Sequence, residues 1–431
     1  MADRRETTGR RSYDRREFLR HSAATALLLG GGATLLSACG SDSKDPVSTS
    51  QGGPSGNAKC GEPPKLSRPN NPATLPLCAD PIKDGLDPES GTLKIFNYAD
   101  YLDPETVKTF EKEYKVKVEL TTFANINEAV DKLQSGAANF DLINMSPDRL
   151  GTLAAAGLIQ PLNKTYIANL SNVWASLQDP FYDKGSQYTI PYTIYTTGIG
   201  YRTDKVDPSD APPTVADATD MLFNRKHKGY AFVLDDDREA LSMALLRLGF
   251  TDVNTEDPAI IAKAGTELQR MVGAVNIKIS GQGYTKLPEG QAWVHQTWSG
   301  DMINAVYNLP EDLGPEVLGY WFQPDGKGLI QSDSWTIGRK AAKPVLAHRF
   351  LNFILDETNA RTNIGFTGYQ QPLTAITPET LIEDGVIPEN LLTAVVREQD
   401  FVNGYEELQL SPKGKKIWED EWAKFTSGAG S

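Results

Sequence analysis

The chain has 431 residues, a formal net charge of −13 and a hydrophobic fraction of 39%. That length is too great for one ordinary hydrophobic core, so we expect two or three domains' worth of chain. The acidic balance argues against nucleic acid and other polyanions as partners, while it permits cationic ones.

The first 20 residues carry seven arginines, of which Arg15 and Arg16 stand together in YDRREFLRHS, and an apolar stretch from Ser22 to Ala38 follows. This order resembles a twin-arginine export signal, and the closing LSAC resembles the lipobox of bacterial lipoproteins. A short transmembrane anchor is the alternative, although a stretch so rich in Gly, Ala and Ser spans a bilayer poorly. We expect residues 1–38 to be a signal peptide, with Cys39 lipidated at the outer face of the cytoplasmic membrane.

Residues 39–91 are rich in Ser, Pro, Gly, Asn and Asp and show no helical or strand period. Such a composition predicts a flexible tether behind the lipid anchor. Cys60 and Cys78 are the remaining cysteines, and outside the cytoplasm they are expected to form a disulfide. In a cytosolic protein they would be free thiols.

Strand and helix then alternate. Leu93, Ile95 and Phe96 predict a strand, and Asp103 followed by Pro104 predicts the start of a helix. Further on we expect strands at VKVELTTF and FDLINM and helices at INEAVDKLQSG and SPDRLGTLAAAG. This alternation indicates an α/β unit with a mostly parallel sheet.

A second series begins after YTIPYTIYTTGIGYR. We expect strands at GYAFVLD and QAWVHQTW and two more around Pro324, Asp325 and Gly326. Helices are predicted at REALSMALLRLG, PAIIAKAGTELQRMV, KPVLAHRFLNFIL, DETNARTNIG and KGKKIWEDEWAKF. No repeat period is present, which argues against a solenoid.

Catalytic and metal-binding motifs are absent from the sequence. It contains no HExxH, CxxC, GxSxG or P-loop pattern, and three histidines follow Cys39, namely His227, His295 and His348. A hydrolase therefore lacks an evident nucleophile and base, and we expect no catalytic residue, metal or cofactor. A surface-anchored hydrolase or a scaffolding lipoprotein stays open as the alternative class.

The stretch FVLDDDREAL concentrates carboxylates and allows several interpretations. Asp236 and Glu239 have the spacing of a capping box at the start of the helix that follows. A calcium loop fits badly, because it needs more oxygen ligands at spaced positions. The third interpretation is a site for a cationic ligand.

Several segments resemble bacterial periplasmic spermidine/putrescine-binding proteins, the binding components of polyamine ABC importers. They occur in that family's order over residues 92–428: LKIFNYADYL, FDLINMSPDRLGTLAAAGLIQPL, YTIPYTIYTTGIGYR, LDDDREALSMALLRLGF, VHQTWSGD, GLIQSDSWTIG and LNFILDETNARTNIGFTGYQQPL. The resemblance implies an α/β fold of two lobes, each with a mixed, mostly parallel sheet, and a ligand cleft between them. It places lobe 1 at 92–200 and 327–375 and lobe 2 at 201–326 and 376–431. The expected partners are a polyamine and the importer's permease subunits, and the expected state is a monomer.

The resemblance also assigns roles to single residues. In that family, carboxylates meet the ammonium groups of the ligand and aromatic rings sandwich its methylenes, as burial of a cation requires. The family's ammonium ligands fall on Asp236, Glu239 and Asp333, and its other site residues fall on Tyr98, Tyr101, Ser146, Trp298, Tyr369 and Gln409.

Three positions depart from the family pattern. Ala99 stands where the family often has threonine, Asp148 replaces a cleft tyrosine, and Gln331 replaces a stacking tryptophan. We count Asp148 and Gln331 among the candidate ligand contacts. These changes widen the expected ligand class to an amine or polyamine, or another small cationic solute.

Overall fold

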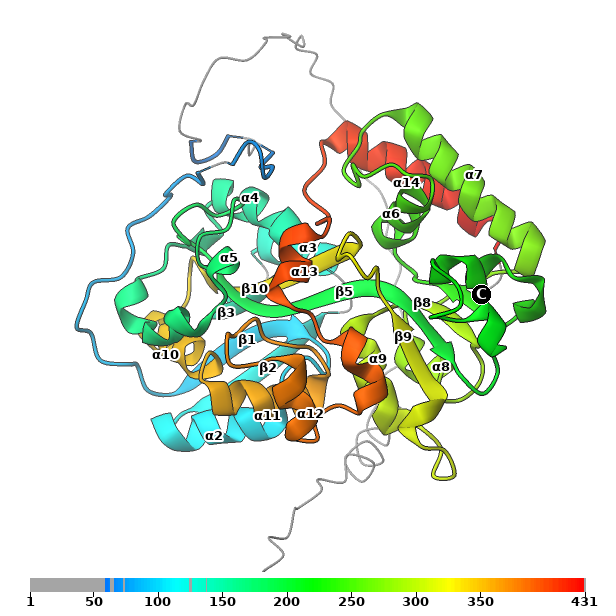
Figure 1. Cartoon of the computed structure of the whole chain (residues 1–431). Coiled ribbons are helices and arrows are strands. Elements are labelled where there is room, and N and C mark those ends of the chain that lie inside the picture. The colour runs from blue at the N-terminus through cyan, green and yellow to red at the C-terminus, as the bar shows by residue number, and fades with distance from the viewer. Residues whose placement is uncertain (1–58, 63–65, 73, 124–125, 137, 430–431) are drawn as a thin grey trace, which may run out of the picture. The chain divides into compact units, whose positions relative to one another are not determined.

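The computed structural model describes residues 59–62, 66–72, 74–123, 126–136 and 138–429. The predicted signal peptide, with Arg15, Arg16 and Cys39, lies outside the described residues. Within them, one mixed sheet has the strand order β2-β1-β3-β10-β5-β8-β6-β7, with β4 beside β10 and β9 beside β5 (Figure 1). The strands are β1 (Thr92–Tyr98), β2 (Lys117–Phe123), β3 (Leu142–Met145), β4 (Ile159–Gln160), β5 (Ile190–Arg202), β6 (Ala231–Val233), β7 (Lys278–Ile279), β8 (Val294–Trp298), β9 (Leu318–Trp321) and β10 (Leu329–Gly338).

Lobe 1 is built on β1, β2 and β3, which run parallel. Asp103 begins the first crossover helix as predicted, because its carboxylate accepts a hydrogen bond from the backbone N–H of Thr106 at 2.7 Å. Leu93 and Ile95 are buried on one face of the sheet and Phe96 on the other, in separate hydrophobic clusters. The helices of this lobe are α2 (Pro104–Tyr114), α3 (Ile126–Gln134), α4 (Pro147–Ala155), α5 (Ala175–Gln178), α10 (Pro344–Ile354) and α11 (Glu357–Thr367).

Lobe 2 is built on β8, β6 and β7, which are also parallel. Its long helices α6, α7 and α14 pack on one another (Figure 1). The elements that follow β5, apart from α10 and α11, include α6 (Asp237–Arg247), α7 (Pro258–Val275), α8 (Gly283–Lys286), α9 (Ser299–Ala305), α12 (Pro378–Glu383), the 3-10 helix η8 (Glu389–Ala394), α13 (Glu398–Asn403) and α14 (Pro412–Thr426). In the described part of the chain, no helix has the length and apolarity needed to span a bilayer.

Strand β5 joins the lobes. The first part of β5 pairs with β10, and its last part pairs antiparallel with β8 and β9. A Cβ atom at Gly198 would lie 2.2 Å from the carbonyl oxygen of Trp321, so only glycine allows β9 to approach β5 this closely. The mixed two-lobe α/β fold predicted from the sequence is therefore confirmed, while the expected crossing points near residues 200, 327 and 375 stay predictions.

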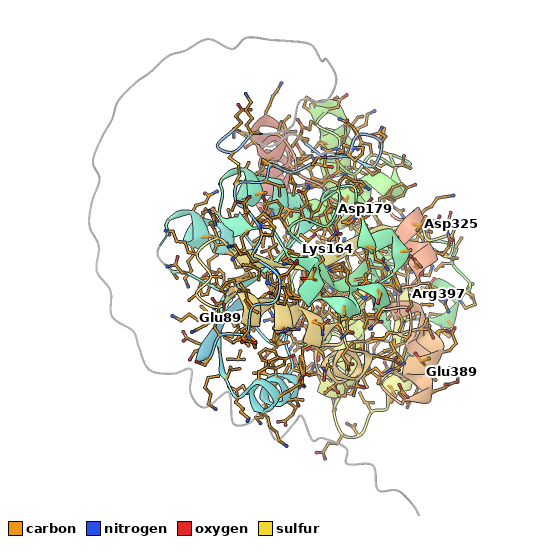
Figure 2. All side chains as sticks on the ribbon, turned by 90° about the vertical axis from the view of Figure 1, so that its left-hand side faces the viewer. Glu89, Lys164, Asp179, Asp325, Glu389 and Arg397 are labelled. Atoms are coloured by element: carbon orange, nitrogen blue, oxygen red, sulfur yellow. A yellow bond between two sulfur atoms is a disulfide. The ribbon has the colours of Figure 1, made fainter. Side chains whose placement is uncertain are left out.

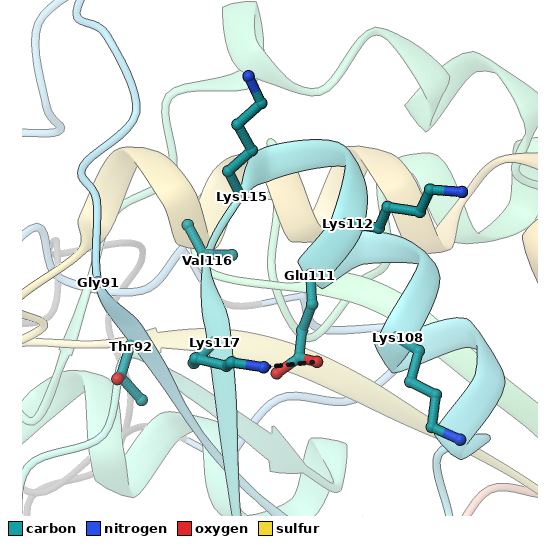
Figure 3. A pocket seen from close by; sticks show the side chains of 8 residues that line it. All are labelled: Gly91, Thr92, Lys108, Glu111, Lys112, Lys115, Val116 and Lys117. Atoms are coloured by element: carbon teal, nitrogen blue, oxygen red, sulfur yellow. Dashed lines mark ion pairs between the residues drawn. The ribbon is translucent and has the colours of Figure 1, made fainter.

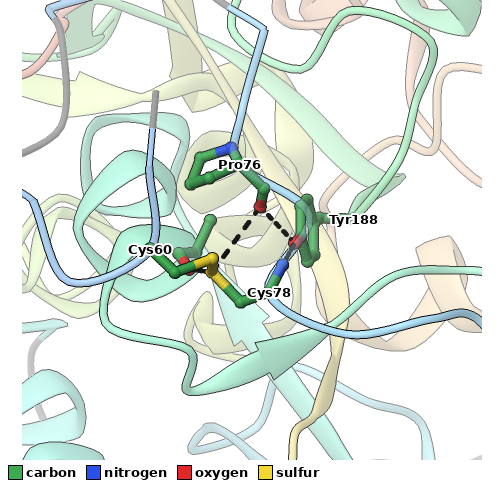
Figure 4. Close-up of a disulfide and its surroundings, with 5 residues drawn as sticks. Cys60, Pro76, Cys78 and Tyr188 are labelled. Atoms are coloured by element: carbon green, nitrogen blue, oxygen red, sulfur yellow. Dashed lines mark hydrogen bonds between the residues drawn. A yellow bond between two sulfur atoms is a disulfide. The ribbon is translucent and has the colours of Figure 1, made fainter. Parts of the chain in front are cut away.

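The described residues of 59–91, which we call the N-terminal arm, contact lobe 1, and Arg68 also donates a hydrogen bond to the carbonyl of Gln409, in the segment before α14. Cys60 and Cys78 form a disulfide, and the hydroxyl of Tyr188 donates a hydrogen bond to the carbonyl of Pro76 at 2.6 Å (Figure 4). Further along, Glu89, which is labelled in Figure 2, accepts hydrogen bonds from the backbone N–H groups of Val345 and Leu346, the first two of α10. The flexible tether expected up to residue 91 is therefore too long, because the structure fixes this part of it by hydrogen bonds and burial.

Candidate functional site

Asp333 is 4% exposed and lies on β10, which pairs with β5, the strand that joins the lobes. The hydroxyl of Tyr101 donates a hydrogen bond to its Oδ2 at 2.9 Å and lies 2.6 Å from the hydroxyl of Thr193. Thr193 stands opposite Asp333 on β5. The structure thus brings together two of the predicted site residues, Asp333 and Tyr101, which are 232 positions apart in the sequence.

The start of α6 supplies carboxylates from lobe 2. Asp236 caps the helix by accepting hydrogen bonds from the backbone N–H groups of Arg238 and Glu239, at 2.9 and 3.1 Å. The side chain of Glu239 does not return to the cap. Its Oε1 accepts a hydrogen bond from Trp298 Nε1 at 2.9 Å, and the residue is 3% exposed. The capping-box interpretation is therefore half right, since Asp236 caps the helix and Glu239 faces Trp298.

A run of aromatic rings connects these two groups of carboxylates. Tyr98 and Tyr369 each contact the ring of Tyr101 edge to face, with centroids 5.6 and 4.9 Å away. Tyr369 in turn contacts Tyr195, which contacts Trp298 at 6.4 Å. Ring faces of this kind can cover methylenes and attract ammonium groups.

Asp301 is a candidate site residue that the sequence reasoning did not single out. It is 6% exposed on α9, and its Oδ1 accepts a hydrogen bond from the hydroxyl of Tyr369 at 2.8 Å. The neighbouring Gly300 lets this ring approach, because a Cβ atom there would lie 2.5 Å from it. The spacing TWSGD, with Asp301 three residues after Trp298 at a strand-to-helix turn, is the signal that could have found it.

Ser146 and Asp148 lie at the start of α4, where Ser146 takes the N-cap position without a side-chain capping bond. Its hydroxyl donates a hydrogen bond to Asp148 Oδ1 at 2.5 Å, and Arg149 Nε lies 3.1 Å from Asp148 Oδ2. Arg149 therefore partly neutralises the charge that Asp148 places where the family pattern has a tyrosine.

Gln331 precedes Asp333 by two residues on β10 and so points to the same face of the sheet, with 8% of its surface exposed. Gln409 lies differently from the expectation, because its Nε2 donates a hydrogen bond to Thr152 of α4 at 3.2 Å. Burial raises the pKa of Glu407, two residues earlier, and the charges of Glu239 and Asp236 raise it further. The side chain of Gln409 therefore contacts α4, whereas Glu407 is the residue of this segment that interacts with the carboxylates of Glu239 and Asp236.

Burial raises the pKa of these carboxyl groups. Loss of hydration, with the charge of Asp236 second, raises the pKa of Glu239 to about 7. Burial likewise raises the pKa of Asp333 to about 6, of Asp301 to about 7 and of Glu406 to about 8. Among the described residues, no hydrogen-bond donor reaches Asp301 Oδ2, Glu406 Oε1 or Glu407 Oε1, although all three atoms are buried. We call Asp236, Glu239, Asp301, Asp333 and Glu407 the interlobe carboxylate cluster.

Other chemistry is not evident in the described part of the chain. No group of three or more His, Cys, Asp or Glu side chains there could hold a metal ion. A hollow of about 480 Å³ beside α2 is lined by lysines, including Lys108, Lys112, Lys115 and Lys117. Figure 3 shows their ammonium groups pointing in different directions, with Lys117 turned toward Glu111. These side chains do not converge on a common ligand position, so the hollow is not a second candidate site.

The raised pKa values predict how the stability of the ligand-free protein depends on pH. A carboxyl group whose pKa is higher in the folded than in the unfolded chain, where it is about 4, stabilises the fold at low pH, and this contribution is lost as the pH rises through the folded value. We therefore expect Glu239 and Asp333 to lower the free energy of unfolding as the pH rises from about 5 to 8. His295 works in the opposite direction, because burial lowers its pKa to about 4.

Urea unfolding of the wild type and of the double variant Glu239→Gln/Asp333→Asn, measured between pH 5 and 8, checks this prediction. The double variant retains His295, so the difference between the two profiles isolates the carboxylates. We expect the variant to gain stability over the wild type toward pH 8. Parallel profiles would show that the two carboxyl groups titrate normally in the folded state.

Two lobes joined by a continuous sheet, with buried carboxylates and aromatic rings at the junction, are the arrangement expected of a solute-binding protein. The family model described as bacterial extracellular solute-binding protein matches residues 105–385. The chain therefore belongs to the bacterial extracellular solute-binding protein family.

Named relatives agree with this assignment. A putrescine/cadaverine-binding protein of Pseudomonas aeruginosa is 30% identical over 66% of this chain and 80% of its own length. The spermidine/putrescine-binding periplasmic protein of Escherichia coli is 28% identical over 70% of this chain and 84% of its own length. Among solved structures, the spermidine/putrescine ABC transporter substrate-binding protein of Streptococcus pneumoniae has a TM-score of 0.63 at 23% identity, covering 79% of this chain and 99% of its own. This similarity to a solved structure supports the assignment of the fold.

Proposed function

We propose that this protein captures polyamines such as spermidine or putrescine outside the cytoplasm and delivers them to the permease of an ABC importer. The observation that carries the proposal is the interlobe carboxylate cluster, in which buried oxygens of Asp301 and Glu407 have no hydrogen-bond donor among the residues that the structure describes. A ligand with several ammonium groups supplies those donors and the compensating charge at once. The names of the relatives support the same ligand class.

The contacts that we assign to the ligand follow from this arrangement. Asp236, Glu239, Asp301, Asp333 and Glu407 bind ammonium groups, and rings of Tyr98, Tyr101, Tyr369 and Trp298 cover the methylenes. Because Asp333, Glu239 and Asp301 are each less than a tenth exposed, the lobes must part before a ligand can enter. We propose no catalytic role and no cofactor.

A thermal-shift screen of the folded domain with amines, amino acids and sugars tests the proposal. A ligand that binds only the folded state adds about 2.7 kcal/mol of stability at a hundred times its dissociation constant. We expect stabilisation by polyamines and little by neutral solutes. No shift with any amine would refute the ligand assignment and leave the family assignment standing.

We also propose that Arg15 and Arg16 direct export and that Cys39 carries a lipid anchor. Replacing both arginines by lysine should leave the precursor in the cytoplasm, and Cys39→Ala should yield a protein without lipid. Cell fractionation and labelling with a radioactive fatty acid measure the two effects separately. Normal export of the double lysine variant would contradict the twin-arginine assignment.

A further inference from the structure

Tyr195 is a candidate ligand contact that the family resemblance did not supply. It lies in β5 directly opposite Gln331 of β10, and Thr193, two positions earlier, stands opposite Asp333. Residues opposite one another in an antiparallel pair share a face of the sheet, and so do residues two apart on one strand. Tyr195, Gln331, Thr193 and Asp333 therefore lie on one face.

The ring of Tyr195 lies between the carboxylates of the two lobes. It contacts Tyr369 with centroids 5.5 Å apart and planes at 86°, and Trp298 at 6.4 Å and 78°. Burial raises the pKa of the Tyr195 hydroxyl well above its ordinary value, and the charges of Asp333 and Glu239 raise it further. A single ring thus lies close to both the lobe 1 and the lobe 2 carboxylates.

The position opposite Tyr195 is where the family pattern has a stacking tryptophan and this chain has Gln331. Cβ atoms of directly opposite residues are about 4.5–5.5 Å apart, so an indole at 331 would lie against the phenol ring at 195 and would need space that neighbouring side chains already fill. Only 8% of Gln331 is exposed in the structure. The chain therefore has one large ring at this register, contributed by β5 in place of β10.

We infer that Tyr195 supplies the aromatic face that is missing at Gln331, and that it binds the methylene segment between an ammonium group at Asp333 and one at Glu239. This inference rests on the proposed polyamine function and adds a residue that determines specificity within it. Because β5 pairs with strands of both lobes, the ring is held at the junction itself.

Calorimetric titration of spermidine and putrescine into four variants tests the inference. Tyr195→Ala should lower the affinity for both amines about 10-fold, as expected for the loss of one stacked ring. Tyr195→Phe should bind nearly as the wild type, because the ring and not the hydroxyl makes the contact. Gln331→Trp alone should weaken binding by crowding the ring, whereas Tyr195→Ala/Gln331→Trp should recover most of the affinity.

Tyr201→Ala is the matched control, because Tyr201 is another partly buried tyrosine of β5 that packs in the core of lobe 2. It should lower thermal stability while it leaves amine affinity unchanged. Wild-type affinity in Tyr195→Ala, or equal losses in the Ala and Phe variants, would overturn the role of the ring. Failure of the wild type to bind any amine would instead refute the proposed function, and the inference with it.

Discussion

Asp333→Asn should weaken polyamine binding by about 2–5 kcal/mol, the usual cost of removing one partner from a buried charge pair. The asparagine keeps an oxygen that can accept the hydrogen bond of Tyr101, so the local structure should persist while the negative charge is lost. Calorimetry with spermidine measures the effect directly.

Asp325→Asn is the control for this experiment. Asp325 lies in the turn that precedes β10, and its carboxylate is exposed and pairs with Lys327 at 3.1 Å (Figure 2). Such an exposed pair contributes little, so amine affinity should stay unchanged. Equal affinities of the Asp333→Asn variant and the wild type would contradict a direct contact between this carboxylate and the ligand.

Trp335→Ala should lower the free energy of unfolding by about 3–5 kcal/mol, because removing a fully buried indole leaves a cavity in the core. Trp335 lies on β10, is 0% exposed and packs against Tyr192 and Phe350 with centroids 4.8 and 6.1 Å away. Urea unfolding followed by circular dichroism checks this expectation. Leu120→Ala is the control, since Leu120 is 40% exposed and its loss should change stability by less than about 0.5 kcal/mol.

The Trp335→Ala substitution should also weaken amine binding at the candidate site. The hydroxyl of Tyr192 donates a hydrogen bond to the carbonyl of Tyr101 and accepts one from Asn363 Nδ2 at 3.1 Å. These bonds position the loop that carries Tyr101, so a displaced Tyr192 should weaken amine binding as well. A variant with unchanged stability would mean that the surrounding side chains collapse fully into the space of the indole.

The local part of the architecture could be predicted from the sequence because it depends on short-range chemistry. The Asp103–Pro104 helix start and the strand at Leu93–Phe96 follow from capping and alternation within a few residues. The cap at Asp236 is of the same kind. The extent of the N-terminal arm could not be predicted, because its polar composition gives no sign of the contacts that Glu89 and Pro76 make with lobe 1.

The resemblance pointed to Glu239 and Asp333, and the structure shows both to be buried; their contact with a ligand stays a prediction. The role of a residue was harder to predict where it depends on side chains that are close in space but not in sequence. The pairing of Asp148 with Arg149 depends on a side-chain direction, and Tyr195 becomes a candidate only once the register of β5 and β10 is known. Glu407 was missed for a further reason. The resemblance pointed to Gln409, two residues later in the same extended segment, and an offset of two residues is easily made in such a segment.

The disulfide in the N-terminal arm determines how a mechanical load would travel. A pull on the chain before residue 60 passes from Cys60 directly to Cys78, so the residues between them carry no tension. Inside that protected loop, Ser67 donates a hydrogen bond to the carbonyl of Phe181 in lobe 1, and Arg68 donates one to the carbonyl of Gln409 at 2.9 Å. Reduction should release about 55 Å of slack in single-molecule pulling, given 18 residues and a Cα separation of 5.6 Å. With the bond intact, a force on the chain before residue 60 would be passed on at Cys78, and the hydrogen bonds of Ser67 to Phe181 and of Arg68 to Gln409 would bear none of it.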